Sequence, residues 1–141
     1  MKIAIINGPN LNLLGTREVE IYGGENFDTF FDDLKKKYPG IEFTFFQSNI
    51  EGELIDEIQK LGFSVDGIIF NPGGYTHTSV ALGDAIAAII TPVIELHISN
   101  VYGREDFRKI SHISAKAKGI ISGLGLNGYE LAVAYFVAKH S

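Results

Sequence analysis

Short apolar runs alternate along the chain with longer stretches in which apolar residues recur every three or four positions. The runs have the length of buried strands, and the periodic stretches have the spacing of helices that cover a core. We predict one further short helix at residues 105–116. The pattern otherwise predicts strands at residues 2–7, 42–47, 67–70, 93–97 and 119–122, and helices at residues 26–38, 52–61, 79–90 and 127–139.

This regular alternation of strand and helix is typical of an α/β protein with a parallel sheet. Right-handed crossovers then place helices on both faces of the sheet. We expect a flavodoxin-like three-layer sandwich, built on a five-stranded parallel sheet of order 2-1-3-4-5. In such sheets, ligands bind beyond the carboxyl ends of the strands, where the strand order reverses between strands 1 and 3.

Composition narrows the class of protein. A chain of 141 residues with 45% apolar content fits a single catalytic domain covering residues 1–141. The net charge of -5 argues against nucleic acid or a membrane surface as a partner, since both require a concentrated basic patch. The absence of cysteine excludes disulfides and thiolate zinc sites, and it fits a reducing compartment. With no signal peptide and no long apolar segment, the sequence predicts a cytoplasmic protein.

Polar side chains gather at the carboxyl ends of three strands that the predicted order makes neighbours. They occupy residues 7–10, 71–77 and 95–100. Because the carboxyl ends of parallel strands meet at one edge of a sheet, these residues are expected to lie together. Such a concentration favours a small-molecule site over a set of unrelated loop residues.

Glu95 and His97 are the clearest chemical pair in this group. They are two positions apart on a predicted strand, so their side chains leave the sheet on the same face. There the carboxylate can hold the imidazole and support its protonated form, as a general acid requires. The alternative is a surface pair on an edge strand, but the predicted order puts this strand inside the sheet. Arg108, a few residues further on, is either a planar donor for a ligand or a solvated helix residue.

The connection at residues 8–24 is far longer than the roughly 2–6 residues that a strand-to-helix turn needs. It contains Arg17 and Tyr22, and a guanidinium beside a phenol stabilises the phenolate. The segment is either part of a site or a surface loop without function, and its length alone does not decide between them. In the first case, Tyr22 as base, His97 as acid and Asn10 near a developing oxyanion describe an elimination next to a carbonyl group. Such a reaction requires no cofactor.

Other motifs are weaker. Residues 123–128 match G-x-G-x-x-G, but no acidic residue follows about 20 positions later as dinucleotide binding requires, so a tight turn explains them better. The four histidines show no metal-ligand spacing. The competing class is a flavodoxin-like binding module without catalysis. Pro9 removes a backbone donor from the loop where such a module would hold phosphate, which weighs against it.

Several short motifs along the chain form one pattern when they are taken together. They are residues 8–15, 17–18, 22–23, 47–49, 51–56, 71–73, 76–79, 95–100 and 104–105. In this order they resemble the type II 3-dehydroquinate dehydratases, and the resemblance spans essentially the whole chain. Three positions depart from the family pattern, namely Val19 in place of proline, Ile50 in place of histidine and Gly103 in place of alanine. None of them removes a proposed catalytic group.

The resemblance implies reversible dehydration of 3-dehydroquinate to 3-dehydroshikimate in the shikimate pathway, through an enolate and without a lysine Schiff base. It implies Tyr22 as the proton acceptor, with Arg17 as the lid residue that activates it. Asn10 would hold a water for the enolate oxygen, and His97 would donate a proton while Glu95 orients it. The implied substrate-binding residues are Asn71, His77, Ile98, Ser99 and Arg108, with Asp84 reaching in from a neighbouring subunit.

The resemblance also implies a homo-oligomer, a dodecamer built as a tetramer of trimers. It implies no cofactor and no metal. Nothing in the pattern of residues alone indicates this assembly.

Overall fold

The computed structural model describes residues 1–14 and 26–140. Its centre is a parallel sheet of order β2-β1-β3-β4-β5, as the sequence predicted. Each strand matches its predicted range except β3, which is one residue longer. The strands are β1 (Lys2–Asn7), β2 (Glu42–Gln47), β3 (Gly67–Asn71), β4 (Val93–His97) and β5 (Gly119–Ser122).

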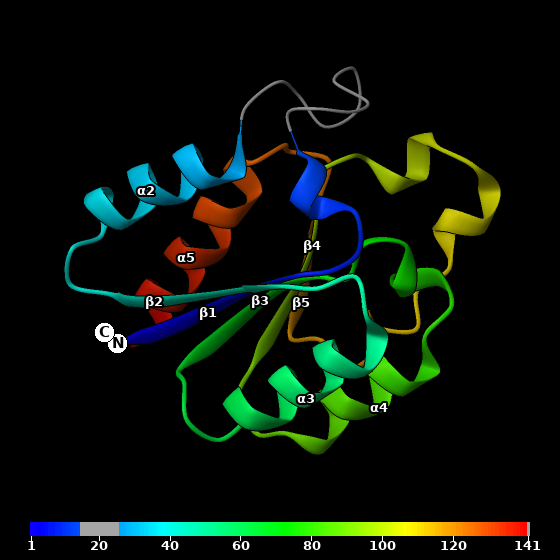
Figure 1. Ribbon diagram of the computed structural model, residues 1–141, viewed down its shortest axis with the longest axis horizontal. Coiled ribbons are helices and arrows are strands. Elements are labelled where there is room, and N and C mark those ends of the chain that lie inside the picture. The colour runs from blue at the N-terminus through cyan, green and yellow to red at the C-terminus, as the bar shows by residue number, and fades with distance from the viewer. Residues whose placement is uncertain (15–25, 141) are drawn as a thin grey trace.

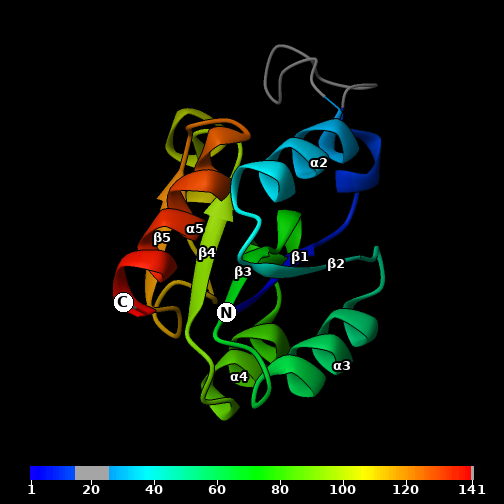
Figure 2. The ribbon, with the colours of Figure 1, turned by 90° about the vertical axis from the view of Figure 1, so that its left-hand side faces the viewer.

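Helices cover both faces of the sheet, giving the expected flavodoxin-like three-layer α/β sandwich. The helices α2 and α5 lie on one face, and α3 and α4 lie on the other (Figures 1 and 2). The helices are α2 (Phe27–Lys37), α3 (Glu51–Leu61), α4 (Val80–Ala88) and α5 (Asn127–His140).

Alternation along the strands divides the core in two. In β1, Ile3 and Ile5 pack toward α2 and α5, whereas Ala4 and Ile6 pack toward α3 and α4. Successive side chains of a strand point to opposite faces, so a strand covered on both faces is apolar at most positions. This explains why β1 and β3 read as nearly unbroken apolar runs, whereas β4 also carries Glu95 and His97 among its buried residues.

One predicted helix is wrong over most of its length. Residues 105–116 contain only the 3-10 turn Asp106–Lys109, followed by bends and turns. The Ser111 hydroxyl accepts the backbone N–H groups of Ile113 and Ser114, each at 3.0 Å. A serine side chain that takes backbone donors in this way competes with the helical hydrogen-bond ladder.

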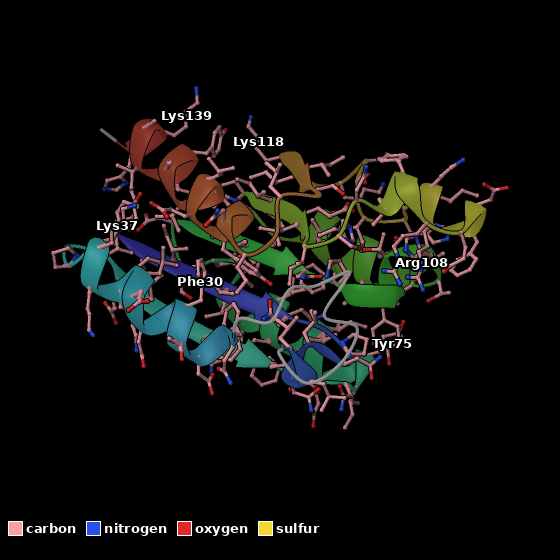
Figure 3. The ribbon with its side chains drawn as sticks, turned by 90° about the horizontal axis from the view of Figure 1, so that it is seen from above. Phe30, Lys37, Tyr75, Arg108, Lys118 and Lys139 are labelled. Atoms are coloured by element: carbon pink, nitrogen blue, oxygen red, sulfur yellow. The ribbon has the colours of Figure 1, made fainter. Side chains whose placement is uncertain are left out.

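The two ends of the described chain lie at the amino edge of the sheet. Met1 and His140 both border a hollow of about 700 Å³ there. Figure 1 marks the termini at this edge, and in Figure 3 Lys139 lies far from Arg108, which is at the carboxyl edge. No helix in the described ranges is long and apolar enough to cross a membrane.

Candidate active site

A pocket of about 150 Å³ lies at the carboxyl edge of the sheet, where the sequence predicted a site. Figure 3 shows Arg108 at the end toward which β1 and β4 point. The pocket is lined by the last residues of β3 and β4 and by the segments that follow β1, β3 and β4, which are neighbours in the sheet. Its lining comprises Pro9, Asn10, Leu11, Leu14, Asn71, Gly73, Gly74, His77, His97, Ile98, Ser99, Val101, Arg104 and Arg108.

The pair Glu95 and His97 is formed as predicted. Glu95 Oε2 lies 2.5 Å from His97 Nε2, and the two side chains are 2% and 7% exposed. With Nε2 bound to the carboxylate, Nδ1 is the ring nitrogen that can act on a ligand. His97 lines the pocket, and Glu95 lies behind it. We therefore assign the site to this pocket rather than to the larger hollow at the amino edge.

Neighbouring hydroxyl groups hold this pair. Ser114 Oγ donates to Glu95 Oε1 at 2.7 Å, and Ser111 Oγ donates to the same oxygen at 3.2 Å. Burial by itself would raise the pKa of the Glu95 carboxyl, but the hydrogen bonds from His97, Ser114 and Ser111 outweigh it and hold the pKa below 4.5. The carboxylate behind His97 is thus ionised at neutral pH. Thr76 Oγ1 lies 3.4 Å from His97 Nε2.

His77 stands beside this acid. Its ring stacks near that of His97, with centroids 6.5 Å apart and an 18° angle between the ring planes. His77 Nδ1 lies 2.7 Å from the carbonyl oxygen of Ile110, to which it donates. Burial lowers the pKa of His77, and charge interactions with His97 and Arg108 lower it further. A neutral His77 therefore offers Nε2 to the pocket as a hydrogen-bond acceptor.

Asn10 reaches the pocket through an unusual backbone conformation. Its φ of 69° is left-handed, the one such value outside glycine in the described ranges. Asparagine tolerates this region better than most residues. Its backbone N–H donates to Asn49 Oδ1 at 2.9 Å, which ties the loop after β1 to the loop after β2.

Asn71 is fixed by the protein on both sides of its amide. Its Oδ1 accepts the N–H of Gly73 at 3.1 Å, and its Nδ2 donates to the Tyr129 hydroxyl at 3.2 Å. That hydroxyl in turn donates to Asn7 Oδ1 at 2.7 Å. Complete burial raises the pKa of Tyr129 strongly, so it stays a neutral donor. The second Nδ2 hydrogen of Asn71 is what this side chain can offer a ligand.

The segment after β4 contributes two positively charged side chains to the pocket. Arg104 and Arg108 both line it, together with the Ile98–Ser99 turn. Arg104 Nη1 donates to Ser99 Oγ at 3.3 Å. Arg108 Nε donates to Glu105, and its guanidinium lies 4.9 Å from the Phe107 ring centre. Two guanidinium groups in a pocket whose described lining contains no acidic side chain favour an anionic ligand.

The structure does not bring every predicted residue to the pocket. Asp84 is exposed on α4 and is absent from the lining of this chain's own pocket. Tyr22 and Arg17 lie outside the described residues.

The sequence reasoning missed Arg104, Ser111 and Ser114. Arg104 was visible as a charged residue on the segment that leaves β4, but no local pattern connects the two serines with Glu95.

No group of three or more histidine or acidic side chains that could hold a metal ion occurs in residues 1–14 and 26–140. The side chains of the described part of the pocket offer several chemical groups. These are one carboxylate-supported imidazole, a neutral imidazole, fixed amides and two guanidinium groups.

The parallel sandwich and the acid pair at its carboxyl edge define a flavodoxin-like protein with an acid–base site for a small anionic molecule. Comparison with known proteins makes this more specific. The chain belongs to the family described as dehydroquinase class II, whose model matches residues 1–137. The resemblance inferred from the motifs is thereby confirmed.

Individual relatives agree with this assignment. The chain is 52% identical over 147 residues to a 3-dehydroquinate dehydratase of Fusobacterium nucleatum, covering 100% of this chain and 99% of that protein. It is 53% identical over 135 residues to a 3-dehydroquinate dehydratase of Campylobacter jejuni, covering 94% and 85%. The crystal structure of a type II dehydroquinase from Butyrivibrio crossotus superimposes with a TM-score of 0.93 at 48% identity, covering 97% of each chain.

Proposed function

We propose that this chain is a single catalytic domain that dehydrates 3-dehydroquinate reversibly to 3-dehydroshikimate, in the shikimate pathway. The observation that carries the proposal is the buried Glu95–His97 pair facing a pocket with two guanidinium groups. Membership of the class II dehydroquinase family supports the choice of substrate. The substrate is a carboxylate, which fits the charge of the pocket.

His97 is the proton donor in this proposal. Its Nε2 is bound to Glu95, so Nδ1 delivers the proton to the departing hydroxyl group. The ionised carboxylate stabilises the positive imidazole before transfer. As the C–O bond breaks, its electron pair leaves with the oxygen, which takes the proton and departs as water.

Tyr22 removes the proton beside the ketone in the first step, with Arg17 stabilising its phenolate. The electron pair of the broken C–H bond forms an enolate. Asn10, held at the pocket by Asn49, is assigned to a water that stabilises the enolate oxygen. When water leaves, the enolate returns to a ketone conjugated with the new double bond.

The remaining polar residues bind the substrate. We assign Arg108 and the Ile98–Ser99 turn to its negative and hydroxyl groups, as the lining of the pocket suggests. Asn71 donates through its remaining amide hydrogen, and neutral His77 accepts through Nε2. No cofactor takes part in any of these steps.

The test is ultraviolet absorbance after 3-dehydroquinate is added to purified protein, because the product is a conjugated enone. We expect turnover by the unmodified chain and a loss in kcat of at least about 100-fold for Tyr22→Phe and His97→Ala. His112→Ala is the matched control, since His112 is exposed and does not line the pocket. Borohydride added with substrate should leave the enzyme active, because no imine forms. Ligand binding without an absorbance change would refute catalysis and favour a binding module.

The proposed enzyme is a cytoplasmic homo-dodecamer built as a tetramer of trimers. The exposed position of Asp84, away from its own pocket, supports a role at a neighbouring subunit's pocket. Light scattering should then give a particle of twelve 15.4 kDa chains. Asp84→Asn should raise KM without changing that mass. An active monomer would contradict the assembly, and cell fractionation tests the compartment.

A further inference from the structure

The Glu95 carboxylate accepts hydrogen bonds from two serine hydroxyls as well as from His97. Ser114 Oγ donates to Oε1 at 2.7 Å. Ser111 Oγ lies 3.2 Å from Oε1 and 3.4 Å from Oε2. His97 Nε2 donates to Oε2 at 2.5 Å. Both oxygens of a side chain that is 2% exposed are thus bound, as the burial of a carboxylate requires.

We infer that Ser111 and Ser114 are positioning residues for proton donation, because their hydroxyl groups fix the Glu95 carboxylate behind His97. The inference rests on the proposed function, in which His97 is the proton donor. Neither serine lines the pocket, so neither is in a position to bind substrate. Their effect on the reaction must pass through Glu95.

The local backbone is built to present these hydroxyls. The Ser111 hydroxyl accepts the N–H groups of Ile113 and Ser114 at 3.0 Å each, which bends the chain into a turn. The same segment is joined to the wall of the pocket, since the N–H of His112 donates to the carbonyl of Thr76 at 2.9 Å. Ser111 therefore has a structural role as well. In the described ranges, the Ser114 hydroxyl makes one hydrogen bond, which it donates to Glu95.

Three other titratable or charged groups belong to the surroundings of Glu95 and its partner. His97 lies on the same strand, and His77 stacks on it from the segment after β3. The charge of Arg108, which follows β4 in the chain, lowers the pKa of His77. The Ser114 hydrogen bond is one of the causes that hold the pKa of Glu95 below its ordinary value. Its loss should let the carboxyl take up a proton at higher pH.

The experiment compares Ser114→Ala with Ser114→Thr in the complete enzyme. For Ser114→Ala we expect kcat to fall about tenfold, the scale of one hydrogen bond to a charged group, while KM stays unchanged. The acidic limb of the kcat profile should move to higher pH. Ser114→Thr keeps a hydroxyl and should restore both kcat and the profile. Ser64→Ala is the control, because that hydroxyl bonds only to carbonyl oxygens near the end of α3 in the described ranges.

A second measurement does not depend on turnover. The carboxyl carbon of Glu95 can be followed by NMR in protein labelled at glutamate, with Glu95→Gln used to assign the signal. In Ser114→Ala its titration should move to higher pH relative to the unmodified chain. Ser64→Ala should leave it in place.

Two results would overturn the inference. One is a Ser114→Ala variant with the kcat, pH profile and carboxyl titration of the unmodified chain. The other is a Ser114→Thr variant as impaired as Ser114→Ala, since the hydroxyl would then not be the active feature. A chain that never converts 3-dehydroquinate would refute the proposed function instead, and the carboxyl titration would still decide for or against the serines.

Discussion

The buried hydroxyl of Tyr129 joins the core to the pocket, and Tyr129→Phe tests this connection. The side chain is 0% exposed, and its ring packs edge-on against Phe27 with centroids 5.2 Å apart. The substitution keeps these ring contacts and removes only the hydroxyl. Asn7 Oδ1 then loses its donor, and Asn71 Nδ2 loses an acceptor.

The expected cost follows from these two groups. A buried polar group left without a partner costs about 1–3 kcal/mol, and relief from burying the hydroxyl offsets part of the total. Within the described structure, Asn7 Nδ2 already lacks a hydrogen-bond partner before the substitution. We expect a net loss of about 2 kcal/mol in the free energy of unfolding, and a Tm lower by about 6 °C.

Urea unfolding at matched protein concentration measures this loss. The midpoint should fall while the m-value stays unchanged, since the surface exposed on unfolding is the same. KM for 3-dehydroquinate should rise as well, because Asn71 lines the pocket and loses one anchor. Tyr102→Phe is the control: this tyrosine is 62% exposed, and its change should stay within about 0.5 kcal/mol. A Tyr129→Phe protein as stable as the unmodified chain would refute the reasoning.

Two other substitutions test the pocket and its support. The pKa of Glu95 is held below 4.5, so its ionised form contributes stability above that pH, and this contribution is lost as the pH falls through the lower native value. Glu95→Gln should therefore flatten the fall in stability below pH 4.5 seen in urea unfolding, and an unchanged fall would contradict this. Gly8→Ala would put a Cβ 2.5 Å from the backbone oxygen of Pro72, so we expect a Tm at least about 5 °C lower and weaker activity. In the control Gly40→Ala, the added Cβ meets nothing within 4 Å, so Tm and activity should stay unchanged. Equal effects of the two substitutions would refute the steric explanation.

The three inner strands β1, β3 and β4 could be predicted because they are buried on both faces. The edge strands β2 and β5 are partly exposed, and their short apolar runs were sufficient to predict them. Runs such as Ile3–Ile6 are apolar without interruption, and the change from run to periodic stretch marks each boundary. Where a helix boundary was predicted wrongly, contacts between residues distant in the sequence set the observed boundary. The predicted helix at residues 79–90 stops at Ala88, because the N–H groups of Ile90 and Thr91 both donate to the carbonyl of Gly62.

The same distinction holds at the site. The two-residue spacing of Glu95 and His97 was enough to predict their contact, since strand geometry fixes it. The hydroxyls that hold Glu95 come from residues 16 and 19 positions further along the chain. Such contacts depend on how a turn packs, and no local pattern records them. The roles of Tyr22 and Arg17 stay predictions, because both residues lie outside the described ranges.

The location of Met1 and His140 at the amino edge has a practical consequence. Both border the hollow there, whereas the pocket opens at the carboxyl edge. A fusion tag or a surface tether attached through either residue would join the chain at the edge of the sheet opposite its own pocket. Immobilised protein should therefore bind small molecules from the surrounding flow as readily as protein in free solution.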